Sequence, residues 1–239
     1  MRSAFLYSPH GIAASAGEGI DVIHVSCLPY LCGEPLPEKA ARHYRLLLSF
    51  PFISKGRAYR LFCERFREFA DRFDGFTLQN IGDYGMLSDL LSGSGLSRDR
   101  FFVAGDVSLN ITNAETALFW QNKLDSAAIL PELQPEEQAA LAGRFPKGLI
   151  PEIIASSKTI VMRSEHCYAA RESGFGCGRC GKTGLSGGSL FDIGGREFPI
   201  ITNPLDCNSL LLTPVESSDL LSEAGDIGLS KDRVIARVR

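Results

Sequence analysis

Short apolar runs alternate with longer amphipathic stretches through the middle of the chain. Four of these runs, each bounded by Gly, Asp, Asn or Pro, begin at Gly75, Phe101, Ser126 and Leu149. The steps between them are 26, 25 and 23 residues, a rhythm that favours repeated βα units in a parallel sheet. The runs do not alternate polar and apolar residues, as expected for strands that are buried on both faces.

Further strand candidates extend the pattern at both ends. Residues 20–27 and 44–50 precede the four runs, residues 233–238 follow them, and AFLY near the start is an eighth candidate. Eight strands predict an α/β fold of the (β/α)8 barrel type, shortened or incomplete at the N-terminus. A doubly wound open sheet is the competing architecture, but no G-x-G-x-x-G opens a helix after the first strand.

The stretches between the runs carry helix signals. Four phenylalanines at helical spacing predict an aromatic stripe that faces the core: Phe62, Phe66, Phe69 and Phe73. Thr112 followed by Glu115 predicts a capping box. Pro135, followed by two glutamates, predicts the first turn of another helix.

The rhythm stops in a segment rich in glycine and cysteine. We therefore divide the chain into a βα-repeat barrel portion (1–166), a cysteine-rich metal or cluster module (167–213), and the last helix and strand of the barrel (214–239). Within the module, SLFDIGGREFPII predicts a β-hairpin that turns at Gly194 and Gly195.

Composition places the chain among ordinary globular proteins, with 239 residues, 44% hydrophobic and 22% charged. A net charge of -3 gives no global footprint for nucleic acid or an anionic membrane. No run reaches the roughly 18 apolar residues of a membrane helix, and no signal-peptide core follows the first residues. We expect a cytoplasmic protein without a membrane partner, in which seven cysteines serve metal, redox or packing roles.

Four of the cysteines fall in the glycine-rich module with the spacing C-x9-C-x2-C-x26-C: Cys167, Cys177, Cys180 and Cys207. Four thiolates from one segment suit an iron-sulfur cluster or a tetrahedral zinc ion. The spacing is also compatible with a redox dithiol or with unliganded thiols. The remaining cysteines are expected to be packing residues: Cys27, Cys32 and Cys63.

Other candidate residues follow predicted strands. His166 adjoins Cys167 and is a candidate ligand or proton donor, or a structural histidine. Glu132 and Asp106 lie at carboxyl ends of strands, where barrel enzymes place their active sites, although each is also a good loop cap. Basic residues exceed acidic ones around the cysteines, which favours an anionic substrate or RNA, or a solvated rim: Lys158, Arg163, Glu165, Arg171, Glu172, Arg179 and Lys182.

Several of these motifs resemble the U32 peptidase family, also called collagenase-like proteases. GDVSLNITNAETA, AAILPELQPEE and IVMRSEHCYAA, followed by Cys-Gly-Arg-Cys, FDIGGREFPII and Cys207, stand in the order of that family's segments. The resemblance covers about residues 75 to 239 and implies a barrel-like fold. It also implies a [4Fe-4S] cluster on Cys167, Cys177, Cys180 and Cys207.

The resemblance further implies oxygen-independent hydroxylation of RNA or of a small aromatic or quinone precursor. Glu132 and His166, chosen for their places at strand ends, are the catalytic candidates. The peptidase name implies a hydrolase, although no Ser/His/Asp set or H-E-x-x-H helix supports it. The family's N-terminal GADaVY stretch has no counterpart here, so a second U32-type subunit is an expected partner. The alternatives are a zinc-stabilised binding or scaffold protein and a non-catalytic partner subunit of a heteromeric U32 enzyme.

Overall fold

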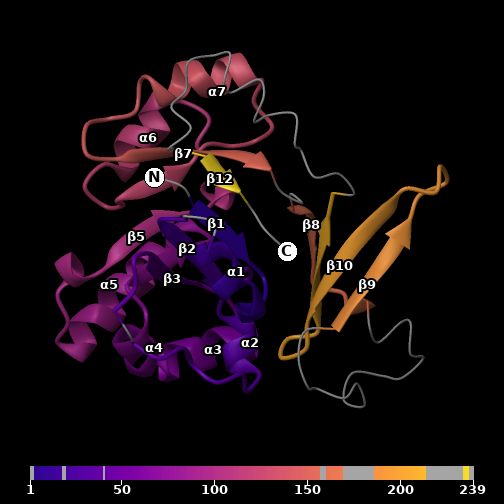
Figure 1. The fold of residues 1–239 in the computed structure, drawn as a ribbon, viewed down its shortest axis with the longest axis horizontal. Helices are drawn as coiled ribbons and strands as arrows, with labels where there is room; N and C mark the ends of the chain where they lie inside the picture. The colour runs from indigo at the N-terminus through magenta and orange to yellow at the C-terminus, as the bar shows by residue number, and fades with distance from the viewer. Residues whose placement is uncertain are drawn as a thin grey trace.

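The computed structural model describes residues 3–17, 20–39, 41–156, 160–168, 186–213 and 234–236. These residues form a barrel of parallel strands surrounded by helices, with a separate antiparallel sheet beside it (Figure 1). Among them, no helix is long and apolar enough to cross a membrane.

Eight parallel strands follow one another around a closed barrel in the order β1-β12-β7-β6-β5-β4-β3-β2. Their bounds are β1 Ser3–Leu6, β2 Val22–Ser26, β3 Arg45–Ser49, β4 Gly75–Leu78, β5 Phe102–Gly105, β6 Ser126–Ala128, β7 Ile150–Ser156 and β12 Val234–Ala236. The predicted α/β barrel architecture is confirmed. Because β1 pairs with both β2 and β12, the described strands leave no gap at the N-terminal side of the barrel.

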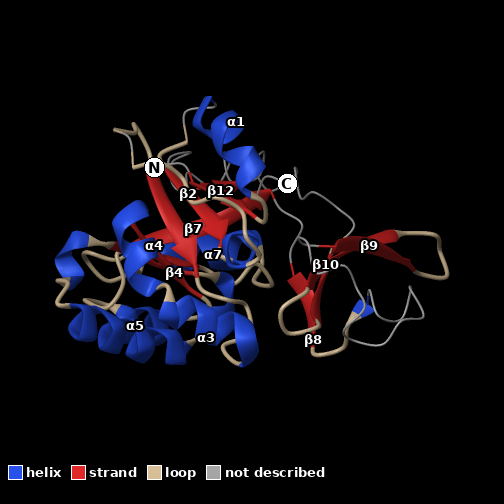
Figure 2. Cartoon of the chain, turned by 90° about the horizontal axis from the view of Figure 1, so that it is seen from below, coloured by secondary structure: helices blue, strands red, loops and turns tan. Residues whose placement is uncertain are grey.

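Helices follow the strands and cover the outside of the barrel (Figure 2). They are α1 Ile12–Gly17, α2 Leu28–Leu31, α3 Gly56–Glu64, α4 Phe66–Arg72, α5 Ile81–Ser94, α6 Ala114–Trp120 and α7 Pro135–Ala142, with 3-10 turns at Pro9–Gly11, Arg98–Arg100 and Val107–Leu109. The aromatic stripe predicted for one helix is divided: Phe62 lies on α3, Phe66 and Phe69 on α4, and Phe73 directly after α4. All four of its phenylalanines are buried in the main core, as predicted.

Two predicted helix starts have different outcomes. Pro135 occupies the first turn of α7, as predicted. The capping box at Thr112 is wrong, because α6 begins one residue later and Asn113 is its N-cap. The Asn113 side-chain oxygen accepts a hydrogen bond from the Thr116 amide at 2.8 Å. Asparagine is at least as good a cap as threonine, so the neighbouring residue takes the role.

The second unit is a four-stranded antiparallel sheet inserted after β7. Its strands are β8 Ile160–Ser164, β9 Ser186–Phe191, β10 Glu197–Asn203 and β11 Asn208–Leu212, in the order β8-β11-β10-β9. The predicted hairpin is therefore present as β9 and β10. Its turn is longer than two residues, since the Asp192 amide donates to the Arg196 carbonyl at 3.1 Å. Only Gly195 of the glycine pair has a positive φ, 78°.

Gly75 at the start of β4 allows close packing inside the barrel. A Cβ at this position would overlap the backbone carbonyl of Phe102 on β5 and crowd the Leu47 side chain on β3. Leu47 belongs to a small apolar cluster with Val22 and Ala104, which lie on strands that are not neighbours of one another. The missing side chain thus leaves space for the apolar layer that fills the barrel interior.

We predict that Gly75→Ala lowers the free energy of unfolding by about 1–3 kcal/mol, because overpacking displaces a neighbouring strand. Urea denaturation of the purified variant measures the change. Gly85→Ala is the matched control, since a Cβ on Gly85 in α5 meets no atom within 4 Å. The control is expected to be neutral or more stable by up to about 1 kcal/mol, and equal stability of the two variants would contradict the packing argument.

Candidate functional site

The barrel interior is polar toward the carboxyl ends of the strands. His24 on β2 is buried, and its Nδ1 lies 2.8 Å from the buried Thr77 Oγ1 on β4. Strand β3 separates β2 from β4, so this hydrogen bond crosses the inside of the barrel. The ring of Phe5 stacks against His24 with 6.2 Å between centroids. An imidazole is therefore held in a fixed position within the barrel.

Gln79, directly after β4, joins several elements at the mouth of the barrel. Its side-chain amide donates to Ser49 Oγ on β3 at 2.8 Å, and its backbone carbonyl accepts from Ser108 Oγ at 2.5 Å. Arg163 on β8 donates to Gln79 Oε1 at 3.4 Å and to the Phe52 carbonyl at 3.0 Å. A guanidinium from the antiparallel sheet thus reaches the carboxyl-end face, where barrel active sites form.

Asp83 is a fully buried carboxylate that shapes the loop after β4. It accepts hydrogen bonds from the amides of Gln79 and Asn80 at 2.8 and 3.0 Å and from Ser54 Oγ at 2.6 Å. Burial raises the pKa of Asp83, and these hydrogen bonds offset part of that rise. The contact with Ser54 ties the β3–α3 loop to the start of α5.

Asp206, in the turn between β10 and β11, attaches the antiparallel sheet to helix α3. Its carboxylate accepts from the backbone amides of Arg57 and Ala58, the latter at 3.0 Å. Gly56 has a φ of 78°, and a Cβ there would overlap the Asp206 carboxylate, so glycine permits the approach. Glu165 beyond β8 forms an ion pair with Lys55 in the same loop. Both contacts dock the same end of the sheet on the β3–α3 loop.

Cys167 and Cys207 lie at this docked end. Ser164, the last residue of β8, pairs with Ser209 of β11, and each cysteine lies just beyond that pair on its own chain segment. The Tyr168 amide donates to Ser209 Oγ at 3.1 Å, which keeps the residue after Cys167 against β11. Cys167 is buried, whereas Cys207 is half-buried with a left-handed φ of 55°. Two thiols 40 residues apart in the sequence thus lie at the same end of the sheet.

Tyr168 and Ser186, the described residues on either side of residues 169–185, lie at the same end of the sheet. Ser186, the first residue of β9, pairs with Thr202, which pairs with Ser209 in the adjacent ladder. Cys177 and Cys180 belong to the intervening part of the sequence and lie outside the described residues. Within the described part of the chain, no group of three or more His, Cys, Asp or Glu side chains is arranged to hold a metal ion. The four-cysteine ligand set stays a prediction.

The two candidate catalytic residues lie in different places. His166 is exposed beside Cys167, and its backbone amide donates to Ser164 Oγ at 3.1 Å. Glu132 is exposed in the turn between β6 and α7, with no hydrogen bond or ion pair to another described residue. Asp106 is buried, and its side chain does not cap the 3-10 turn that follows. Asp106 thus occupies the N-cap position of that turn without a side-chain cap to it.

Comparison with known proteins assigns no family. No protein-family model and no curated protein matches this chain. One solved structure with partial similarity is the spore cortex-lytic enzyme SleL of Bacillus cereus, at 7% identity and a TM-score of 0.42, covering 98% of this chain and 70% of that chain. Similarity at this level attributes neither family nor activity to the chain.

Sequence reasoning missed several buried polar residues of the interior. His24 and Glu152 stand within the apolar runs DVIHVSC and LIPEIIA, and both are 2% exposed. The available signal is a polar residue inside a strand that is otherwise apolar on both faces, since burial of such a group requires a partner.

Arg163 is predicted as part of a basic patch, although it lies at the barrel mouth. Its patch companions Lys158, Arg171, Glu172, Arg179 and Lys182 lie outside the described residues.

Of the three cysteines predicted to be packing residues, only Cys27 is fully buried. Cys32 and Cys63 are half-buried. Burial raises the pKa of all three thiols above the ordinary value of 9.0. Asp83 raises the pKa of Cys63 further, while Arg57 opposes the rise at Cys32.

We predict that Asp206→Ala lowers the free energy of unfolding by about 0.5–2 kcal/mol, the cost of losing a helix cap. Asp206→Asn keeps one acceptor oxygen and should lose less. Asp89→Ala removes an exposed carboxylate from α5 and is the matched control. Urea unfolding followed by circular dichroism gives the three values, and an Asp206→Ala protein as stable as the control would refute the attachment.

We also predict that native Cys27 resists alkylation by iodoacetamide at pH 8, because only the thiolate reacts and burial disfavours it. Cys32 and Cys63 should react faster than Cys27 but more slowly than in urea. Their rates should still rise above pH 9, since both pKa values are raised. Peptide mass spectrometry after timed labelling measures each rate. Labelling of Cys27 at the rate of the denatured chain would contradict this order.

Proposed function

We propose that this chain is an iron-sulfur enzyme in which Cys167, Cys177, Cys180 and Cys207 hold a [4Fe-4S] cluster beside the mouth of the barrel. The reaction is an oxygen-independent hydroxylation of RNA or of a small aromatic or quinone precursor, the class implied by the U32 resemblance. A bound cluster would supply electron transfer. The chain's own residues would bind and orient the substrate at the carboxyl-end face.

One observation carries the proposal: the antiparallel sheet is docked on the barrel by the end that bears its two described cysteines. Asp206 precedes Cys207 and caps α3, while Glu165, two residues before Cys167, pairs with Lys55. Arg163 on the same strand reaches Gln79 at the mouth. The thiols and the polar interior are thereby attached to the same segment, the β3–α3 loop (residues 50–55) and the first turn of α3.

The donor chemistry fits a cluster. Cys167 is buried and Cys207 half-buried, so a bound group would be partly shielded from water, and burial is one of the factors that set a cluster's potential. The left-handed backbone of Cys207 is rare for a residue other than glycine, asparagine or aspartate, and such conformations concentrate at functional sites. The same donors would also accept zinc, and the zinc-stabilised scaffold is the alternative.

The barrel supplies the polar groups that chemistry on a bound substrate needs. Asp106 and Glu152 are buried carboxylates, and His24 is a buried imidazole. We assign to them proton transfer and substrate orientation, and to Arg163 the attraction of an anionic or hydrogen-bonding part of the substrate. Binding of RNA would draw on basic side chains around the cysteines.

Anaerobic purification followed by visible absorption and by iron, sulfide and zinc assays tests the proposal. We expect a brown protein with about four iron and four sulfide ions per chain, as a [4Fe-4S] cluster requires. Cys180→Ala should lose the colour. Cys63→Ala, which changes a half-buried thiol on α3, is the matched control and should keep it.

A colourless protein that holds one zinc ion and no sulfide would overturn the enzyme proposal and favour the scaffold. Peptide hydrolysis by the protein freed of contaminating proteases would favour the hydrolase implied by the family name. Co-purification with a second U32-type subunit, measured by light scattering, tests the partner separately.

A further inference from the structure

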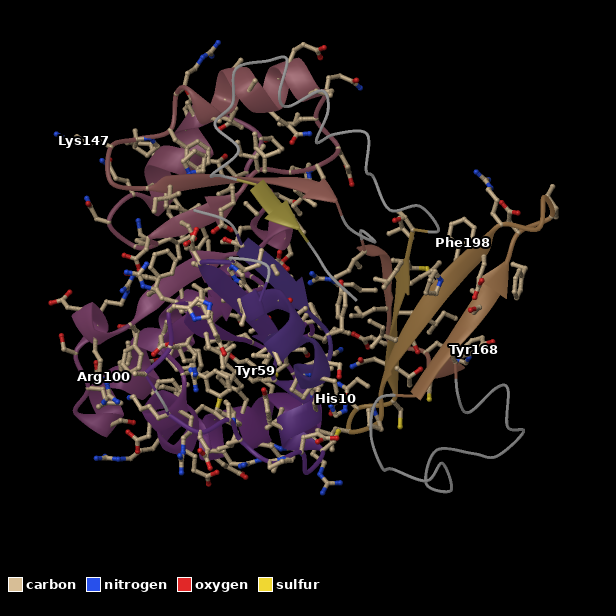
Figure 3. The ribbon with its side chains drawn as sticks, in the orientation of Figure 1. His10, Tyr59, Arg100, Lys147, Tyr168 and Phe198 are labelled. Atoms are coloured by element: carbon tan, nitrogen blue, oxygen red, sulfur yellow. The ribbon has the colours of Figure 1, made fainter. Side chains whose placement is uncertain are left out.

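A cavity lies on the antiparallel sheet. Its volume is about 340 Å³, and its lining is Met162, Ser164, His166, Tyr168, Leu190, Ile200, Ser209, Leu210 and Leu211. Figure 3 labels Tyr168 and Phe198 on this sheet, at the opposite side of the molecule from Arg100. Pockets for small molecules start at about 300 Å³, so the cavity has the size of a ligand site.

The cavity belongs to the sheet face that does not pack on the barrel. Ile201 packs against the main core, and Arg163 reaches the barrel mouth. Side chains alternate between the faces of a strand, so Met162, Leu211 and Ile200, which form one row of paired residues, lie on the other face. The cavity is therefore distinct from the polar interior of the barrel.

Tyr168 forms a fixed wall of the cavity. Its hydroxyl donates to the Ser189 carbonyl at 3.0 Å, and its backbone amide donates to Ser209 Oγ at 3.1 Å. The ring lies over Gly188, where a Cβ would overlap the ring atom Cε1. The glycine thus provides the space in which the tyrosine ring sits against β9.

The lining indicates the chemistry of the ligand. Met162 and Leu190 are 48% and 42% exposed, so apolar surface faces water unless a ligand covers it. A methionine and a tyrosine ring adapt well to aromatic groups. Polar groups are few: the His166 imidazole, and the hydroxyls of Ser164 and Ser209, which accept backbone amides but donate to no described residue. Among the described residues, the lining holds no Asp, Glu, Lys or Arg.

We propose that this cavity binds a small aromatic molecule that carries one hydrogen-bonding oxygen, with the ring among Met162, Leu190 and Leu211 and the oxygen toward His166 and the serines. The site extends beyond the proposed function, because its binding does not require the cluster. It adjoins Cys167 through His166 and Tyr168, so a ligand here would lie next to the predicted cluster.

Fluorescence titration with 2-naphthol and with naphthalene tests the site in the full chain. We expect saturable binding of 2-naphthol, at least about tenfold tighter than naphthalene, since an unpaired polar group in the cavity is costly. His166→Phe should keep the apolar contacts and reduce that preference. Leu190→Glu should weaken 2-naphthol about tenfold or more by placing a charge in the apolar lining.

Phe191→Glu is the matched control for Leu190→Glu. Phe191 is the next residue of β9, is 67% exposed and does not line the cavity, so binding should be unchanged. Equal loss of binding in both variants would overturn the site assignment, as would absence of binding to the unmodified chain. Binding that appears only after residues 169–185 are replaced would identify that segment as the occupant and overturn the proposal as well.

Cys180→Ala separates this proposal from the proposed function. A colourless Cys180→Ala protein that still binds 2-naphthol is the expected result. If the unmodified chain holds no cluster but binds 2-naphthol, the proposed function fails and the cavity assignment stands. If it holds the cluster but binds neither probe, the cavity assignment fails alone.

Discussion

The carboxylate of Asp206 is the contact on which the arrangement of the two units depends. A helix begins with backbone amides that have no partner within the helix, and α3 receives an acceptor for two of them from a residue about 150 positions later in the chain. A cap of this kind fixes direction as well as distance, because the carboxylate must point along the helix axis. The turn that carries Asp206 also carries Cys207, so the orientation of the sheet and the position of the thiol are set together.

The barrel interior shows how a parallel barrel accommodates polar groups. Val22, Leu47 and Ala104 form a small apolar cluster, while His24 pairs with Thr77 across the interior. Apolar side chains on the outer faces of the same strands pack under the helices. The strands are therefore buried on both sides, but the two sides differ in polarity. A polar interior is thereby enclosed by an apolar shell.

Much of the barrel could be predicted from the sequence, because strand spacing and composition are local properties. The runs at Gly75, Phe101, Ser126 and Leu149 became β4 to β7, and the phenylalanines around α3 and α4 became core. The position of the antiparallel sheet could not be predicted, since it depends on Asp206 meeting amides far away in the chain. For the same reason, the approach of Cys167 to Cys207 follows from strand register and not from their spacing. The polar interior escapes prediction because an apolar run indicates a buried strand without distinguishing its two faces.

The insertion of the sheet between β7 and β12 has a consequence for the route by which the chain folds. Strands β1 to β7 pair with sequence neighbours, whereas β12 is separated from β7 by residues 157–233 and meets β1 from the far end of the sequence. Contacts of such high sequence separation form late and slowly. During synthesis, the edges of β1 and β7 would remain open while the intervening sheet is made, and open strand edges invite pairing with other chains. The barrel is thus most vulnerable to aggregation just before the short strand β12 completes the ring.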